Sequence, residues 1–244
     1  MNEMRSYNTF AEQAHVGQPI SQEQIAQELS KVFTWMVFGL LTSGLAAYST
    51  TLYPEVYLSF MSKIQNPIIM ILISLAPVFL IRYIYNKADL SPTGAASLFL
   101  IYSAFFGLFL GTIFFMYSLG SLFTTFLVAS TTFASMAIYG YVTKKDLTRL
   151  GTLLGFAVIG LFLAFIINYF VGSPLMHMIY SGIGVIIFLG LTAYDTQAIK
   201  EQIIHSHSAH GFLPGKVIIL GAFHLYINFI NLFMMLLQFL GDRD

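Results

Sequence analysis

The chain has 244 residues, of which 57% are hydrophobic and only 9% are charged. Soluble domains carry about 25% charged residues, and a soluble chain this apolar would expose a large hydrophobic surface to water. The net charge is zero and cysteine is absent. The composition therefore excludes a soluble enzyme, a disordered chain, a nucleic-acid-binding protein and a disulfide-linked fold, and it favours a polytopic membrane protein.

Residues 1–30 form a polar N-terminal segment without the apolar stretch of a cleaved signal peptide. We therefore expect an uncleaved first span. Near the end of this segment, the run Ser21-Gln22-Glu23-Gln24 has the pattern of a capping box. This pattern predicts a helix that begins here and continues into the first span.

Stretches without Asp, Glu, Lys or Arg mark the spans, because lipid penalises charged side chains. Such stretches cover residues 32–54, 64–81, 90–143, 150–194 and 217–241. One helical span needs about 20 residues, so the third and fourth stretches each hold two spans, with turns at 118–121 and 172–174. The predicted fold is an all-α membrane domain over 31–241, with seven transmembrane helices at about 32–53, 66–85, 95–117, 121–142, 151–171, 177–199 and 216–240.

Basic residues are distributed unevenly between the two predicted sides of the membrane. The side of the N-terminus carries Arg5, Lys31, Arg82, Lys87, Lys144, Lys145, Arg149, Lys200 and Lys216, and the other side carries Lys63 and Arg243. Positively charged loops stay in the cytoplasm. The distribution predicts a cytoplasmic N-terminus and a C-terminus on the outside.

Arg82 and Asp195 are charged residues near the inner ends of the second and sixth predicted spans. Each lies five residues before a lysine, Lys87 and Lys200 respectively, which places both about 7–8 Å inside their helix ends. A buried contact between the two is therefore possible. The alternative is that Arg82 extends to the lipid headgroups and Asp195 caps a frayed helix end.

The last span has one polar face, made of Gly221, His224, Asn228, Asn231 and Gln238. At 100° per residue these positions lie close together, so this face is expected to pack on protein or water and the last helix to be central. The alternative is that the amides only join helices, which is also our interpretation of Asn168 in the fifth span.

Histidines at positions 205, 207 and 210 fall in the predicted sixth loop, where a solvated loop competes with a metal site. The enzyme classes that we considered are disfavoured. The last span has no lysine for a retinal, no zinc-protease or phosphate-binding motif occurs, and Asp195 is the only acidic residue well inside a span. We expect no enzyme activity and no cofactor.

Three stretches resemble the Bax inhibitor-1 family, also called the transmembrane Bax inhibitor motif family. They are 139–147 (YGYVTKKDL), 190–197 (GLTAYDTQ) and 225–233 (LYINFINLF). The resemblance extends over about 30–241, and the short polar tail is similar to that of bacterial members. It implies a bacterial inner-membrane protein whose last helix is enclosed by the other six.

The resemblance also implies a pH-sensitive calcium leak in which two aspartates share a proton and interact with an arginine. Asp195 matches the first aspartate and Arg82 matches the arginine, whereas Asn228 stands where the second aspartate is expected. An Asp–Asn pair lacks the like-charge repulsion that two carboxylates have. If Arg82 contacts Asp195, the carboxylate is expected to stay ionised, and His224 could supply a substitute titrating group.

Two functional hypotheses remain open from the sequence. In the first, the chain is a passive cation conduit in which Asp195 and nearby amide oxygens bind calcium transiently. In the second, it is a membrane regulatory protein that modulates a membrane-bound AAA-type protease or a stress response, with the polar N-terminus as the handle. The lipid bilayer is the expected surrounding in both.

Overall fold

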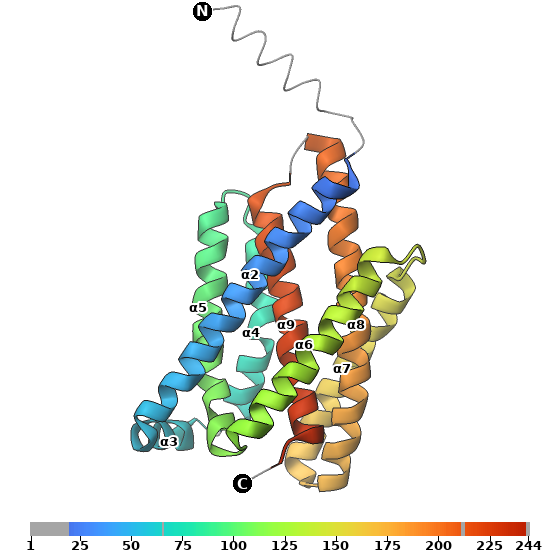
Figure 1. Ribbon diagram of the computed structural model, residues 1–244. Coiled ribbons are helices and arrows are strands. Elements are labelled where there is room, and N and C mark those ends of the chain that lie inside the picture. The colour runs from blue at the N-terminus through green and yellow to red at the C-terminus, as the bar shows by residue number, and fades with distance from the viewer. Residues whose placement is uncertain (1–19, 65, 211–212, 243–244) are drawn as a thin grey trace, which may run out of the picture.

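The computed structural model describes residues 20–64, 66–210 and 213–242, and this part of the chain is helical without strands. Figure 1 shows the α-helices as a bundle in which α2 and α6 run obliquely across the steeper α5, α8 and α9, with one short helix at its lower end. Their bounds are α2 Gln22–Ser49, α3 Pro54–Lys63, α4 Pro67–Asn86, α5 Pro92–Leu110, α6 Leu119–Val142, α7 Thr148–Val171, α8 Pro174–His210 and α9 Gly215–Leu240. Short 3-10 segments, Thr50–Leu52 and Gly111–Phe115, extend α2 and α5.

Six of these helices are long and apolar enough to cross a membrane, namely α2, α5, α6, α7, α8 and α9. In α4, the described apolar stretch is the shorter Ile71–Asn86. The all-helical class agrees with the sequence prediction, and six of the seven predicted crossings coincide with one of these six helices.

The helix ends follow the polar residues of the turns. The predicted capping box is present, since the Ser21 Oγ accepts from the Gln24 backbone N–H and the Gln24 side chain accepts from the Ser21 backbone N–H. Ser118 caps α6 through its Oγ alone, which accepts from the Ser121 backbone N–H at 3.2 Å. Gly172 ends α7 at φ 67°, a left-handed conformation that glycine adopts without strain.

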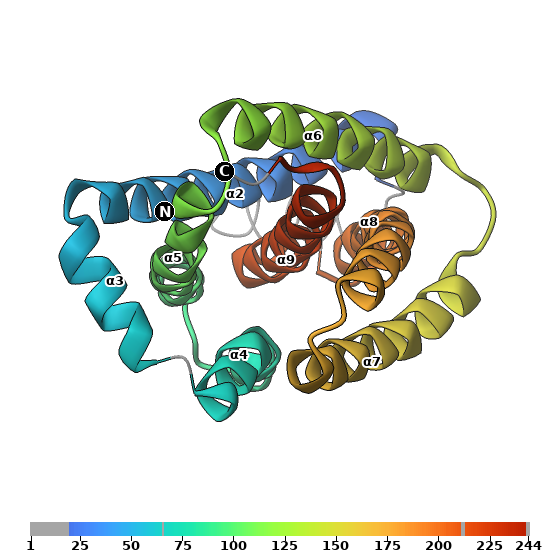
Figure 2. The ribbon, with the colours of Figure 1, turned by 90° about the horizontal axis from the view of Figure 1, so that it is seen from below.

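α9 is the central helix. In its apolar window 72% of the residues are buried, compared with 11–39% in the other candidate spans. Figure 2, seen along the bundle, shows α9 in the middle, and it packs against α2, α4, α5, α6 and α8. The resemblance implied enclosure by all six other spans. The outermost helix α7 instead packs on the far side of α8, so five helices form the main enclosure.

Two regions differ from the sequence prediction. The loop expected after the first span contains α3, a ten-residue helix that begins at Pro54, where proline is favoured because its missing N–H needs no partner. The sixth loop is shorter than predicted, because α8 continues to His210. His205 and His207 therefore lie on a helix and not in a loop.

Candidate functional site

The polar residues of α8 and α9 meet at one point of the bundle core. The Asn228 Nδ2 donates a hydrogen bond to the Asp195 Oδ2 across 2.7 Å. Asn228 is buried and Asp195 is half-buried. Asn228 of the third motif therefore bonds directly to Asp195 of the second motif. This contact is expected if Asn228 takes the place of the second aspartate.

His224 lies one turn before Asn228 on α9, and it interacts electrostatically with Asp195. Its side chain is exposed on the protein surface. The Nδ1 is 2.8 Å from the Leu220 carbonyl oxygen. Because that oxygen can only accept, the Nδ1 carries the hydrogen, and the Nε2 of the neutral ring has the lone pair.

Arg82 does not join this site. Arg82 is exposed on α4, whereas Pro77 and Ile84 of the same helix are buried. Among the described residues the one ion pair is between Glu28 and Lys31, so the contact between Arg82 and Asp195 that the sequence allowed is not formed. The physical reason is the rotation of α4, since Arg82 is two positions from Ile84 and two helical positions differ by about 200°.

The other residues of the polar face have separate partners. Asn231 donates from Nδ2 to the Ile227 carbonyl oxygen of its own helix, at 2.9 Å. The Gln238 Oε1 accepts from the Ser181 Oγ of α8 at 3.0 Å. The Asn168 Oδ1 of α7 accepts from the Ser173 backbone N–H at 3.1 Å. These contacts join helices or turns, as the alternative interpretation of the amides expects.

A pocket of about 520 Å³ with both polar and apolar walls lies at the same end of α9 as Gln238. The polar residues in its wall are Asn168, Tyr169, Ser173, His177, Tyr180 and Gln238. It is an open recess between the turn that joins α7 to α8 and the end of α9.

Sequence reasoning missed a hydroxyl network near the centre of α9. The Tyr226 hydroxyl lies 2.7 Å from the Ser43 Oγ of α2, which in turn lies 2.8 Å from the Ser103 carbonyl oxygen of α5. All three residues are buried. Because the carbonyl accepts from Ser43, Tyr226 donates to Ser43. The position of Tyr226 in the third motif was the one sequence feature that pointed to it. The spacing of residues along the sequence does not show that Ser43 and Ser103, on two other helices, are its partners.

The first two motifs pack against one another. A Cβ atom on Gly140 of α6 would overlap the Ala193 carbonyl of α8, so only glycine permits this approach. Beyond α6, the Gln197 side chain donates to the Lys145 carbonyl and accepts from the Leu147 backbone N–H, each at 2.8 Å. The motif residues thus fix the connection between α6 and α7 to the helix that carries Asp195.

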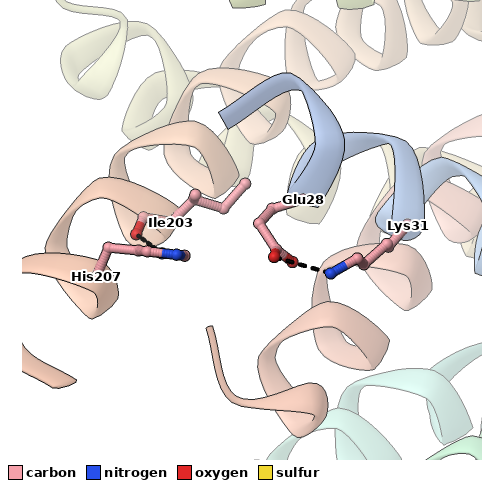
Figure 3. A network of polar contacts seen from close by, with 4 residues as sticks. All are labelled: Glu28, Lys31, Ile203 and His207. Carbon is pink, nitrogen blue, oxygen red and sulfur yellow. Dashed lines mark hydrogen bonds and ion pairs between the residues drawn. The ribbon is translucent and has the colours of Figure 1, made fainter. Parts of the chain in front are cut away.

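A second polar cluster lies where α2 and α8 extend beyond the other helices. Figure 3 shows the His207 ring of α8 on the side facing the Glu28 carboxylate of α2, which pairs with Lys31 at 2.8 Å. The His207 Nδ1 is 3.3 Å from the Ile203 carbonyl oxygen. No group of three or more His, Cys, Asp or Glu side chains that could hold a metal occurs within the described segments.

Six long apolar helices in the described part of the chain, among them the central helix whose buried Asn228 bonds to Asp195, define an integral membrane protein of the helical-bundle class. The sequence of residues 25–244 matches the family described as "Inhibitor of apoptosis-promoting Bax1", and the chain belongs to this family, as the resemblance predicted.

Relatives align over most of their length. The chain is 39% identical to the inner membrane protein YbhL of Escherichia coli, over 88% of this chain and 91% of that protein. It is 37% identical to a protein of Borreliella burgdorferi over the same shares. A membrane protein of Streptococcus pyogenes is 32% identical over 94% of this chain and 99% of its own.

Proposed function

We propose that the protein is a calcium-permeable leak channel of the Bax inhibitor-1 type, in which Asp195 is the carboxylate that passing cations meet. The observation that carries the proposal is the hydrogen bond between Asp195 and Asn228 at the junction of α8 and the central helix. A half-buried acid on the interior side of a membrane helix is costly to maintain, and such residues commonly mark ion pathways.

The donor atoms suit a weak and transient calcium site. Asp195 supplies carboxylate oxygens, and the Asn228 side chain could rotate to present its carbonyl oxygen in place of the amide hydrogens. A single carboxylate gives a shallow binding site, which is what a leak requires, because an ion that binds tightly does not leave. Calcium is the transported ion in this proposal and no cofactor is involved.

His224 is the proposed pH-dependent element, because an imidazole ring can take up a proton whereas the Asn228 amide cannot. A protonated His224 beside Asp195 would compete with a cation for the carboxylate. The flux should therefore be lower at acidic pH, with a weaker pH dependence than a pair of aspartates would give. Because Arg82 is exposed on α4, we assign it no direct role in this step.

Reconstitution in liposomes tests the proposal. Calcium flux at about pH 6 and about pH 8 should be lost or strongly reduced in Asp195→Asn, and His224→Ala should remove its pH dependence. Asn231→Ala is the matched control, because Asn231 bonds only to its own helix. Flux that is unchanged in Asp195→Asn contradicts the channel.

We further propose that α4 is the seventh span, with the N-terminus in the cytoplasm of a bacterial inner membrane and the C-terminus outside. The 20 residues of α4 span about 30 Å, which matches the hydrocarbon core. The start of α2 and the end of α9 lie at opposite ends of the bundle, as an odd number of spans requires (Figure 1). Cysteine accessibility at positions 22 and 240 from either side tests the orientation.

The alternative is a regulatory role toward a membrane-bound AAA-type protease, with residues 1–31 as the handle. Residues 1–19 lie outside the described part of the chain, so this proposal rests on the polar composition of the segment alone. Deletion of residues 1–28 separates the two. Altered protein turnover with intact calcium flux favours regulation, and flux that depends on Asp195 favours the channel.

A further inference from the structure

A long apolar groove lies between α2 and α6. Its volume is about 750 Å³, and its floor includes Phe229 of the central helix. α2 packs on α5 and α9, and α6 packs on α8 and α9, so α2 and α6 form opposite walls of the groove. Small side chains widen the groove, and its walls include Phe33, Leu40 and Gly44 of α2 with Ala134, Ala137 and Tyr141 of α6.

The groove opens toward the hydrocarbon core of the bilayer, because residues on both rims belong to candidate spans and are exposed. Leu41 and Leu45 of α2 are 57% and 71% exposed, and Ile138 of α6 is 63% exposed. Water is a poor occupant, because a buried water needs two to four polar partners and the lining is almost entirely apolar. An apolar occupant from the membrane is required to supply the missing van der Waals contacts.

The shape and direction of the groove suit an extended chain of methylene groups. The lining of α2 runs from Leu29 to Leu45, a length of about 24 Å along a candidate span. An acyl chain of a bilayer lipid lies along the same direction and is apolar over its whole length, as the lining is almost everywhere.

One end of the groove carries positive charge. Tyr141 lines the groove near the end of α6, and the Lys200 Nζ lies 5.1 Å from the centroid of its ring and donates to its carbonyl oxygen at 2.7 Å. Lys144 and Lys145 follow directly after α6, and both are exposed. Three lysines beside the end of an apolar groove are complementary to an anionic headgroup.

We propose that the groove between α2 and α6 binds one acyl chain of an anionic phospholipid, whose headgroup lies at Lys144, Lys145 and Lys200. This site is separate from Asp195 and does not depend on the channel proposal. The lipid would hold α2 and α6 at their observed separation on either side of the central helix.

The test uses the full chain in phosphatidylcholine vesicles that contain phosphatidylglycerol with a photoreactive group in one acyl chain. Labelling should be concentrated on groove residues of α2 and α6 relative to the lipid-facing side of α7. Gly44→Leu should fill the groove, because nothing lies within 4 Å of a Cβ atom there, and it should reduce groove labelling at least about fivefold. Gly160→Leu on α7 is the matched control, since its Cβ would be equally unobstructed.

The headgroup is tested with Lys144→Gln combined with Lys145→Gln, against Lys63→Gln at the opposite end of the bundle. The double variant should reduce labelling by phosphatidylglycerol and leave labelling by phosphatidylcholine unchanged. Equal labelling of the groove and α7, or groove labelling that Gly44→Leu leaves intact, overturns the lipid site. Equal labelling by the two lipids overturns the anionic headgroup, and a change of oligomeric state in Gly44→Leu would assign the groove to a second copy.

Discussion

α7 and α9 are both long apolar helices, yet they occupy opposite positions in the bundle. α7 is the more apolar of the two and lies at the periphery, whereas α9 carries the polar residues and lies at the centre. In water the more apolar helix would be the buried one. In a bilayer, lipid solvates apolar side chains as well as protein does, so polar and small residues decide which helix is enclosed. The burial of α9 is therefore a consequence of Asn228, Tyr226 and their partners.

The largest difference between the two helices should come from removing an aromatic side chain. Phe223 of α9 is 0% exposed and packs against Phe99 and Tyr102, whereas Phe156 of α7 is 69% exposed. Phe223→Ala should cost about 2 kcal/mol or more, because it leaves a cavity. Phe156→Ala should have little effect, since lipid replaces the lost contacts. Thermal unfolding in the same lipid compares them, and equal losses would contradict the enclosure argument.

Polar partners should matter next. Asn228→Leu removes the hydrogen bond to Asp195 and leaves the carboxylate without this partner. The expected loss of stability is about 1–2 kcal/mol. The matched substitution Asn231→Leu removes only a bond to its own helix and should cost less. Equilibrium unfolding in mixed micelles measures both, and a larger effect at Asn231 would show that the Asp195 pair does not hold α9 in place.

The connection between α6 and α7 offers a smaller effect. Gln197→Leu removes both hydrogen bonds to the loop backbone, at Lys145 and Leu147. Each bond contributes about 0.5–1.5 kcal/mol, so the loop should open locally before the bundle unfolds. Trypsin cleavage at Lys144 and Lys145 should become faster. Gln202→Leu on the exposed face of α8 is the control. Equal cleavage rates in the two variants would show that the Gln197 hydrogen bonds do not hold the loop closed.

The smallest effect concerns the start of α7. Hydrogen bonding from Thr148 holds the pKa of Asp146 below its ordinary value. A lowered carboxyl pKa stabilises the folded state at neutral pH, and this contribution is lost as the pH falls through the folded-state pKa. Asp146→Ala should therefore lower the melting temperature slightly at about pH 7 and not at acidic pH. A difference that grows toward acidic pH would contradict the assignment.

Sequence reasoning succeeded where one residue type has a local consequence. The capping box at Ser21 and the turn at Gly172 depend on the chain nearby, and both are formed. It also placed Asn228 beside Asp195, because two motifs with a known relationship were present. α3 was not predicted, because the absence of charged residues over about 20 positions identifies only membrane spans. A ten-residue helix between two spans is too short to produce such a stretch.

The remaining errors concern how a helix is rotated and what packs on it. Arg82 was at a suitable depth for Asp195, but depth does not determine direction, and the inward residues of α4 are on the opposite side. The same limit hid the contact of Tyr226 with Ser43, since the two are separated by 183 positions. Polar partners on different helices depend on packing, which spacing along one helix does not encode.

The central claim is that Asp195 and its neighbour on α9 control cation passage, and the substitution Asn228→Asp tests it most directly. The change places a second carboxylate beside Asp195, and like-charge repulsion within the pair raises the proton affinity of one acid. The account predicts that calcium flux into proteoliposomes becomes steeply pH-dependent between about pH 6 and 8, in a way that Asn231→Asp does not reproduce. A flux with the same pH dependence in Asn228→Asp and the original chain would contradict it.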